Sequence, residues 1–303
     1  MVALPAMDPR NPRTVGDMLR VLTGIVGDTM EARWITAHVT GAPAGELVTG
    51  AAAPVAPDAV ARALDLAARR AAGEPLQYVL GSWAFRRLEL HVDPRVLVPR
   101  PETEQVVEVA LRELGRVPAR PSGAAVVVDL GTGSGAIALS IAAEAPAAVE
   151  VWATDVSPDA LAVAEMNHAA CAAALRRDAR VVFARGSWFD ALPSDLLGGV
   201  DLVVSNPPYV SAAEWEALDP VVREHEPRSA LVPGPTGFEG PQAVIAGAPR
   251  WLRPGGVLVV EIGASQADAA VAAADAAGLA EAAVRPDLAG RPRALVARRA
   301  PPR

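Results

Sequence analysis

The chain has 303 residues, of which 51% are hydrophobic, enough for two globular domains or for one large domain with an appendage. Its formal net charge is −7 and every basic residue is an arginine, which argues against tight binding to duplex nucleic acid. The single cysteine, Cys171, excludes an intramolecular disulfide and a thiolate cage for a metal. We find no signal peptide, and acidic residues break the alanine-rich stretch 262–280, so we expect a cytoplasmic protein that binds no membrane.

The first eighty residues carry helical periodicity. Residues 1–13 are rich in proline and lack such periodicity, so we expect a mobile leader. Thr14 is a typical helix-capping residue and precedes apolar residues at helical spacing; the same spacing recurs over residues 31–39 and 57–72. Residues 14–80 are therefore predicted to form a small helical domain.

The pattern changes between residues 84 and 98, where apolar and polar side chains alternate around the turn sequence Asp93-Pro94-Arg95. This alternation predicts a β-hairpin, and we assign residues 81–100 to a connector. A second domain would then cover residues 101–303. Its first helix is expected to open at the proline-punctuated segment 99–104, whose glutamates suit the positive end of a helix dipole.

A glycine-rich loop follows the first strand of this second domain. The apolar strand over 124–128 runs into Asp129 and then into the loop Gly131-Thr132-Gly133-Ser134-Gly135. Glycines let the backbone turn sharply and approach a ligand closely. Loops of this type also bind dinucleotides, so the glycines alone are weak support. Asp129 favours a ligand with an amino group, which it would meet directly or through water, because a pyrophosphate there would be repelled.

Two further strand ends extend this ligand site. The strand 149–154 ends at Asp155, which is placed to accept both hydroxyls of a ribose, although it would also serve to cap the helix that starts near Ser157. Trp188 follows a third strand, 181–183, and is either a stacking partner for adenine or a core residue. With the glycine loop, this is the layout expected for S-adenosylmethionine.

The fourth strand, 201–205, ends abruptly at Asn206-Pro207-Pro208-Tyr209, because proline cannot donate to a strand ladder. Asn206 offers an amide oxygen, Pro207 a carbonyl and Tyr209 a flat ring face, a set that suits a planar NH₂ group. The plain alternative is an ordinary end of a strand. A fifth strand is expected over 255–263. Helical segments fall between these five strands, which predicts a mostly parallel sheet with the ligand across its C-terminal edge. Two final strands are expected at 282–284 and 294–297, around the loop 287–293.

These residues resemble the protein-(glutamine-N5) methyltransferases that modify peptide chain release factors, over nearly all of residues 14–298. The matching segments are 73–78, 98–104, 129–135, Asp155, 188–189, 206–209, 226–231, 261–266 and 287–293. The resemblance implies an α/β fold: a Rossmann-like class I methyltransferase domain with a seven-stranded, mostly parallel sheet behind a small N-terminal helical domain. Two departures are Ser187, where relatives usually carry an acid, and the Pro- and Gly-rich segment 232–240.

The resemblance also implies roles for individual residues. S-adenosylmethionine would be bound by the loop Gly131–Gly135, Asp155, Trp188 and Asn206, and the acceptor glutamine of a release factor would be held by Asn206, Pro207, Pro208 and Tyr209. Hydrogen bonds to the two N–H groups would orient the amide nitrogen, so neither a metal nor a covalent nucleophile is expected. The four histidines are scattered and form no motif.

Two other functions stay open at this point. An adenine-N6 methyltransferase uses the same kind of acceptor loop, since adenine also carries a conjugated NH₂ group, but it needs a basic surface for nucleic acid. A protein that binds S-adenosylmethionine without catalysis is the other, and it would have no use for the Asn-Pro-Pro-Tyr loop. We therefore expect release factors as partners and no direct binding to DNA.

Overall fold

The computed structural model describes residues 12–120 and 123–301. The chain forms two compact units. The first holds the residues up to Gly81 together with Pro220–His225, and the second holds Ser82–Asp219 and the residues from Glu226 onward. The segment Pro220–His225, which groups with the N-terminal unit, was not part of the helical domain expected from the sequence.

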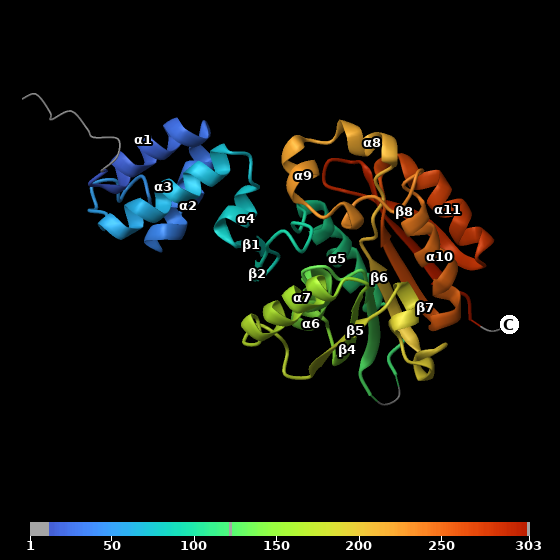
Figure 1. The fold of residues 1–303 in the computed structure, drawn as a ribbon. Helices are drawn as coiled ribbons and strands as arrows, with labels where there is room; N and C mark the ends of the chain where they lie inside the picture. Colours follow the sequence, from blue (N-terminus) through green and yellow to red (C-terminus); the bar gives the residue numbers. More distant parts are fainter. Residues whose placement is uncertain (1–11, 121–122, 302–303) are drawn as a thin grey trace, which may run out of the picture. The chain divides into compact units, whose positions relative to one another are not determined.

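Helices and strands alternate along the second unit from α5 to β5 (Figure 1). The α-helices are α1 (Val15–Val26), α2 (Thr29–Thr40), α3 (Pro57–Ala71), α4 (Leu76–Leu80), α5 (Pro101–Leu114), α6 (Ala136–Glu144), α7 (Pro158–Ala170), α8 (Ala212–Ala217), α9 (Pro220–His225), α10 (Glu239–Trp251) and α11 (Ala267–Ala276). The strands are β1 (Ser82–Phe85), β2 (Leu88–His91), β3 (Ala125–Leu130), β4 (Val149–Asp155), β5 (Ala179–Arg185), β6 (Val200–Ser205), β7 (Leu252–Glu261), β8 (Leu279–Pro286) and β9 (Pro292–Arg299).

The N-terminal unit is helical, as its periodicity predicts. The Thr14 hydroxyl accepts the backbone N–H of Asp17 and caps α1, and Gly27 ends this helix in the left-handed conformation that glycine adopts without strain. Residues 1–11 of the expected leader lie outside the described residues. The expected end of the leader at residue 13 is too late, because Pro12 is buried and the Arg13 carbonyl accepts the N–H of Val55.

The β-hairpin of the connector is present, but its turn is not the expected one. Strands β1 and β2 pair antiparallel with Phe85 opposite Leu88, so the turn is Arg86-Arg87 and not Asp93-Pro94-Arg95. Arg86 adopts a left-handed φ of 51° there. The sequence misled because arginines are not typical turn residues. Residues 92–100 form no strand and continue towards α5.

The second unit contains a seven-stranded sheet in the order β5-β4-β3-β6-β7-β9-β8. All pairs from β5 to β7 are parallel, whereas β9 pairs antiparallel with both β7 and β8. The chain goes from β3 outward to β4 and β5, and then returns to place β6 on the other side of β3. Ligands bind at such a reversal in open α/β sheets, outside the C-terminal ends of the strands. The predicted α/β fold with a mostly parallel sheet is confirmed.

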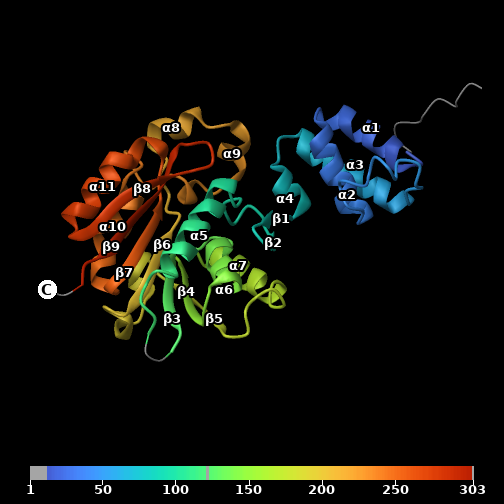
Figure 2. The same ribbon diagram turned by 180° about the vertical axis from the view of Figure 1, so that it is seen from behind.

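Helices cover both faces of this sheet, as Figure 2 shows from behind. Successive strand residues face opposite sides: Val127 packs in a core with α5 and α6, whereas Val128 packs in a core with α10 and α11. Strands covered on both faces need continuous apolar sequences, which explains the valine-rich runs. None of the helices in the described part of the chain is long and apolar enough to cross a bilayer.

Candidate active site

The register of the parallel strands places four loop starts side by side. Leu130, the last residue of β3, lies opposite both Thr154 of β4 and Ser205 of β6. Ser205 in turn lies opposite Val260 of β7, and its hydroxyl donates to the Leu130 carbonyl at 2.7 Å. The residues that follow, on each strand, therefore meet at one edge of the sheet.

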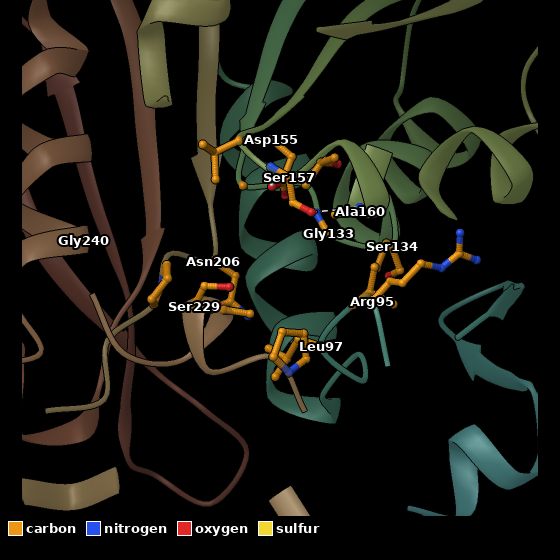
Figure 3. A pocket seen from close by; sticks show the side chains of 18 of the residues that line it. Arg95, Leu97, Gly133, Ser134, Asp155, Ser157, Ala160, Asn206, Ser229 and Gly240 are labelled. Atoms are coloured by element: carbon orange, nitrogen blue, oxygen red, sulfur yellow. Dashed lines mark hydrogen bonds between the residues drawn. The ribbon is translucent and has the colours of Figure 1, made fainter. Parts of the chain in front are cut away.

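A cavity of about 660 Å³ lies at this edge and within the second unit. That volume is within the range of about 300–1,000 Å³ that is usual for sites of small ligands and cofactors. Figure 3 shows Gly133, Asp155 and Ser157 together on one side and Asn206 with Ser229 on another. The predicted site residues that line the cavity are Gly131, Thr132, Gly133, Ser134, Asp155, Trp188, Asn206 and Pro208. Asp129, Gly135, Pro207 and Tyr209 are not among its lining residues.

The glycine loop reaches the cavity because its backbone is left-handed at Gly131, Gly133 and Gly135, with φ values of 73°, 54° and 83°. Asp129 lies fully buried beneath this loop. Its Oδ2 accepts the Thr132 hydroxyl at 2.6 Å and the Ala138 N–H at 3.1 Å, while its Oδ1 has no hydrogen-bond partner among the described residues. Burial raises the pKa of Asp129 to about 7.

Asp155 ends β4 with its carboxylate already oriented. Oδ2 accepts the Gly133 N–H and Oδ1 accepts the Ser157 N–H, both at 2.9 Å, which leaves each oxygen free to accept a further hydrogen bond. The helix α7 is capped by the Ser157 hydroxyl and not by Asp155, contrary to the alternative reading of this carboxylate. Burial raises the pKa of Asp155 above its ordinary value, although the backbone N–H groups oppose this shift.

Trp188 lies between the cavity and the core. It lines the cavity and also packs against the core beneath α10 and α11. Its backbone φ of 49° is left-handed, a conformation that costs free energy in a residue other than glycine. A Cβ on Gly131 would lie 4.0 Å from Cζ3 of the indole, so the ring faces the bare glycine backbone.

The loop after β6, Asn206–Tyr209, presents only part of itself to the cavity. Asn206 and Pro208 line the cavity, whereas Pro207 is buried. The Tyr209 hydroxyl donates to Oε1 of Glu261 at 3.1 Å. Burial raises the pKa of Tyr209, which therefore stays a neutral phenol.

A buried hydrogen-bond network connects this loop to α5 and β7. The Asn206 Nδ2 donates to the Thr103 hydroxyl at 3.1 Å, and that hydroxyl donates to Oε2 of Glu261 at 2.7 Å. Glu261 is fully buried, and burial raises its pKa to about 7. Sequence reasoning gave Thr103 and Glu261 no function. One signal was present: Glu261 is the only charged residue near the end of the apolar run 255–263.

The Pro- and Gly-rich segment 232–240 packs backbone against backbone on the acceptor loop. A Cβ at Gly240 would lie 2.4 Å from the Pro208 carbonyl oxygen, and one at Gly237 would lie 2.6 Å from the Tyr209 carbonyl oxygen. The Gln266 Nε2 donates to the carbonyls of Tyr209 and Gly237, at 3.0 and 3.1 Å, and so joins the two segments. The glycines of this segment therefore allow it to hold the acceptor loop in place.

The remaining wall of the cavity comes from two segments without predicted site roles. Residues 94–100 and 227–233 both contribute to the lining. Glu226 joins them: its Oε2 accepts the Val98 N–H at 3.2 Å and its Oε1 accepts a hydrogen bond from Arg100 Nη2 at 2.6 Å.

Within residues 12–120 and 123–301, no group of three or more His, Cys, Asp or Glu side chains is arranged to hold a metal ion.

Comparison with known proteins gives matches along most of the chain. Residues 22–81 match the PrmC N-terminal domain, and residues 121–283 match a methyltransferase domain. A release factor glutamine methyltransferase from Cereibacter sphaeroides is 43% identical over 275 residues, covering 91% of this chain and 92% of the relative. One from Streptomyces coelicolor is 42% identical over 282 residues, covering 92% and 94%.

Among solved structures, the hMettl16 catalytic domain in complex with the MAT2A 3′UTR hairpin 6 superposes with a TM-score of 0.51. It is 16% identical to this chain and covers 78% of it, and the alignment spans 82% of that domain. At this identity the similarity concerns the fold alone.

We predict that Gly240→Ala destabilises the second unit by about 1–3 kcal/mol, because the added methyl group overlaps the Pro208 carbonyl and must displace the acceptor loop. Urea unfolding followed by tryptophan fluorescence measures the change. Gly115→Ala is the matched control: Gly115 has a helical φ of −64°, and its Cβ would come no closer than 3.5 Å to a neighbouring atom. Equal stability of the two variants would contradict the close contact as the cause.

Proposed function

The chain belongs to the release factor glutamine methyltransferase family, and we propose which of its residues carry out the reaction. The reaction is methyl transfer from S-adenosylmethionine to a glutamine side-chain nitrogen. The observation on which the proposal rests is that Asn206 and Asp155 line one cavity at the C-terminal edge of the sheet. Asp155 suits a ribose and Asn206 suits a planar amide, so the cavity has room and partners for both reactants.

The described residues fit S-adenosylmethionine. The three left-handed glycines expose backbone to the cavity, Asp155 keeps acceptor capacity on both oxygens, and the Trp188 ring lies beside them. We propose that the three glycines contact the part of S-adenosylmethionine that lies against the loop, that Asp155 binds its ribose and that Trp188 stacks on its adenine. Asp129 acts through the loop: it fixes Thr132 and the start of α6. When bound, S-adenosylmethionine supplies an electrophilic methyl group on its sulfonium sulfur.

The chain itself must prepare the amide nitrogen of the acceptor. The lone pair of an amide nitrogen is delocalised into its carbonyl, so this nitrogen is a poor nucleophile. An acceptor on each N–H raises the electron density on nitrogen and fixes its direction. We propose that Oδ1 of Asn206 and the carbonyl of Pro207 are these acceptors, that Pro208 and the Tyr209 ring shape the pocket, and that Gln266 and Gly237 keep the loop in position.

The proposed protein substrate is a peptide chain release factor, which places the enzyme in the cytoplasm, where translation terminates. We propose no direct binding to DNA, since the chain has a net charge of −7. The N-terminal unit carries exposed apolar side chains, including Met30 at 53% and Val48 at 58% exposure, and we propose that it recognises the folded substrate.

We expect Asp155→Ala to weaken binding of S-adenosylmethionine by about 1–3 kcal/mol, because two ribose hydroxyls lose a charged acceptor. Isothermal titration calorimetry measures this change. Asp190→Ala, which removes an exposed carboxylate outside the cavity, is the control and should bind normally. Unchanged affinity in Asp155→Ala would remove Asp155 from the ribose site.

Asn206→Ala should lower kcat by roughly 10²–10³-fold, as expected when one preorganised polar group is lost at a reacting centre. Its affinity for S-adenosylmethionine should fall much less. Single-turnover transfer to a release factor, read by the mass of the glutamine-containing peptide, measures the rate. Tyr209→Phe keeps the ring and loses the hydroxyl, which donates to Glu261 and accepts from Arg293, so its effect should be mild, whereas Tyr209→Ala should be severe. Near-normal turnover by Asn206→Ala would falsify the proposed role of the loop.

The role of the N-terminal unit is tested by the double substitution Met30→Glu and Val48→Glu. We expect kcat/KM for an intact release factor to fall by about tenfold or more, equal to roughly 1.4 kcal/mol, and kcat/KM for a short glutamine peptide to stay unchanged. Leu197→Glu places a charge on an exposed apolar position of the second unit and is the control. If both substrates lose activity equally, the unit does not recognise the folded factor.

A further inference from the structure

The amide of Asn206 is held by a buried chain of hydrogen bonds, and the proposed function gives this chain no role. Its Nδ2 lies 3.1 Å from Oγ1 of Thr103, which lies 2.7 Å from Oε2 of Glu261. Thr103 is 4% exposed and Glu261 is fully buried, so water does not compete for these partners. The Tyr209 hydroxyl occupies the other oxygen of Glu261 at 3.1 Å.

The polarity of this chain follows from counting protons. An ionised carboxylate can only accept hydrogen bonds, so the Thr103 hydroxyl must use its single hydrogen to donate to Glu261. The hydroxyl can then only accept from Asn206, and the group that Asn206 turns to it must be the NH₂. The amide oxygen is left to face the cavity, where it can accept a hydrogen bond. Reversal of the Glu261–Thr103 hydrogen bond would reverse the amide and present its NH₂ group to the NH₂ group of the acceptor.

We propose that Thr103 and Glu261 are positioning residues that hold the Asn206 amide with its oxygen towards the acceptor, and that protonation of Glu261 removes this preference and slows methyl transfer. The proposal rests on the proposed role of Asn206. It adds that the loop alone does not define the acceptor site: a helix N-terminus and the end of β7 decide which face of the amide the substrate meets.

The charges around Glu261 place this switch near neutral pH. Burial raises the pKa of Glu261 to about 7, and Glu102 of α5 also raises it. The Thr103 hydroxyl, Arg293 in β9 and the Tyr209 hydroxyl lower it. Because the ionised form is the active one, kcat should be highest above pH 7 and should fall as the pH decreases through about 7.

Thr103 supplies the first test, since valine has nearly the shape of threonine and serine keeps the hydroxyl. We expect Thr103→Val to lower kcat roughly 10- to 100-fold, because the unpartnered NH₂ group then turns towards the cavity. Thr103→Ser should keep most of the activity. Affinity for S-adenosylmethionine, measured by calorimetry on both variants, should stay near that of the wild type.

The pH profile separates this role from simple structural support. The wild type should lose kcat on the acidic side with one ionisation, and Glu261→Gln should give a low, flat profile. Thr103→Val should also be flat, because no hydroxyl then connects Glu261 to Asn206. Asp129→Asn is the control, since Asp129 has a similar pKa of about 7 but lies under the glycine loop; it should keep the acidic fall of kcat.

The side-chain NH₂ resonances of Asn206 give a readout independent of activity. In ¹H–¹⁵N spectra they should shift as the pH crosses about 7 and lose this dependence in Thr103→Val. The amide of Asn167 is the internal control, because it donates to the carbonyls of His91 and Ser134 and should not respond. An unchanged kcat in both Thr103→Val and Glu261→Gln, with Asn206→Ala still inactive, would overturn this inference alone. An active Asn206→Ala would overturn the proposed function as well.

Discussion

The parallel pairing of β4, β3, β6 and β7 is the constraint on which the site depends. Leu130 lies opposite Thr154 and Ser205, and Ser205 lies opposite Val260, so Asp155, Asn206 and Glu261 occupy or follow neighbouring strand ends. A slip by one residue would turn every side chain of a strand to the opposite face, and both faces are buried. The packing of valines against α5 and α6 on one side and α10 and α11 on the other therefore fixes the functional side chains as well.

Two buried carboxylates support this edge in the same way. Neither Asp129 nor Glu261 lines the cavity, yet each accepts a threonine hydroxyl that does: Thr132 for Asp129 and Thr103 for Glu261. Burial raises the pKa of both groups to about 7. A buried carboxylate that holds a neutral hydroxyl fixes its neighbour's direction without placing a full charge at the reacting atoms. Asp129 and Glu261, which lie behind the cavity-lining residues, therefore fix the geometry of the loops.

Much of the fold was predictable from the sequence, because strands buried on both faces read as apolar runs and the glycine loop follows one of them directly. The starts of two helices were also predictable, because Thr14 is a typical capping residue and Pro57 is a typical first residue of a helix. The hairpin turn at Arg86 was missed because its conformation is imposed by the surroundings: its guanidinium donates to both oxygens of Glu144, and its own N–H donates to Glu104. Tertiary contacts of that kind leave no local pattern.

In the candidate site, too, residues marked by a local sequence pattern were predictable and residues placed by tertiary contacts were not. Asp155, Asn206 and the glycine loop could be proposed from the sequence because each lies at a strand end or within a few residues after one. The contact between Thr103 and Glu261 joins residues 158 positions apart, and the contact between Glu226 and Arg100 joins residues 126 apart, so no spacing rule relates them. The role of the segment 232–240 was not predictable either. This segment contacts the acceptor loop through the backbone of Gly237 and Gly240, where a Cβ would clash, and not through a recognisable side chain.

The central claim is that this cavity transfers a methyl group to a glutamine amide of a protein and not to a nucleobase. Incubating the full-length protein with S-adenosylmethionine labelled in its methyl group, together with equal amounts of a release factor and duplex DNA, tests this claim most directly. The account predicts that label enters the release factor, adds one methyl group to one glutamine side chain, and leaves the DNA unlabelled. Label in adenine, or in the release factor at a residue other than glutamine, would contradict it.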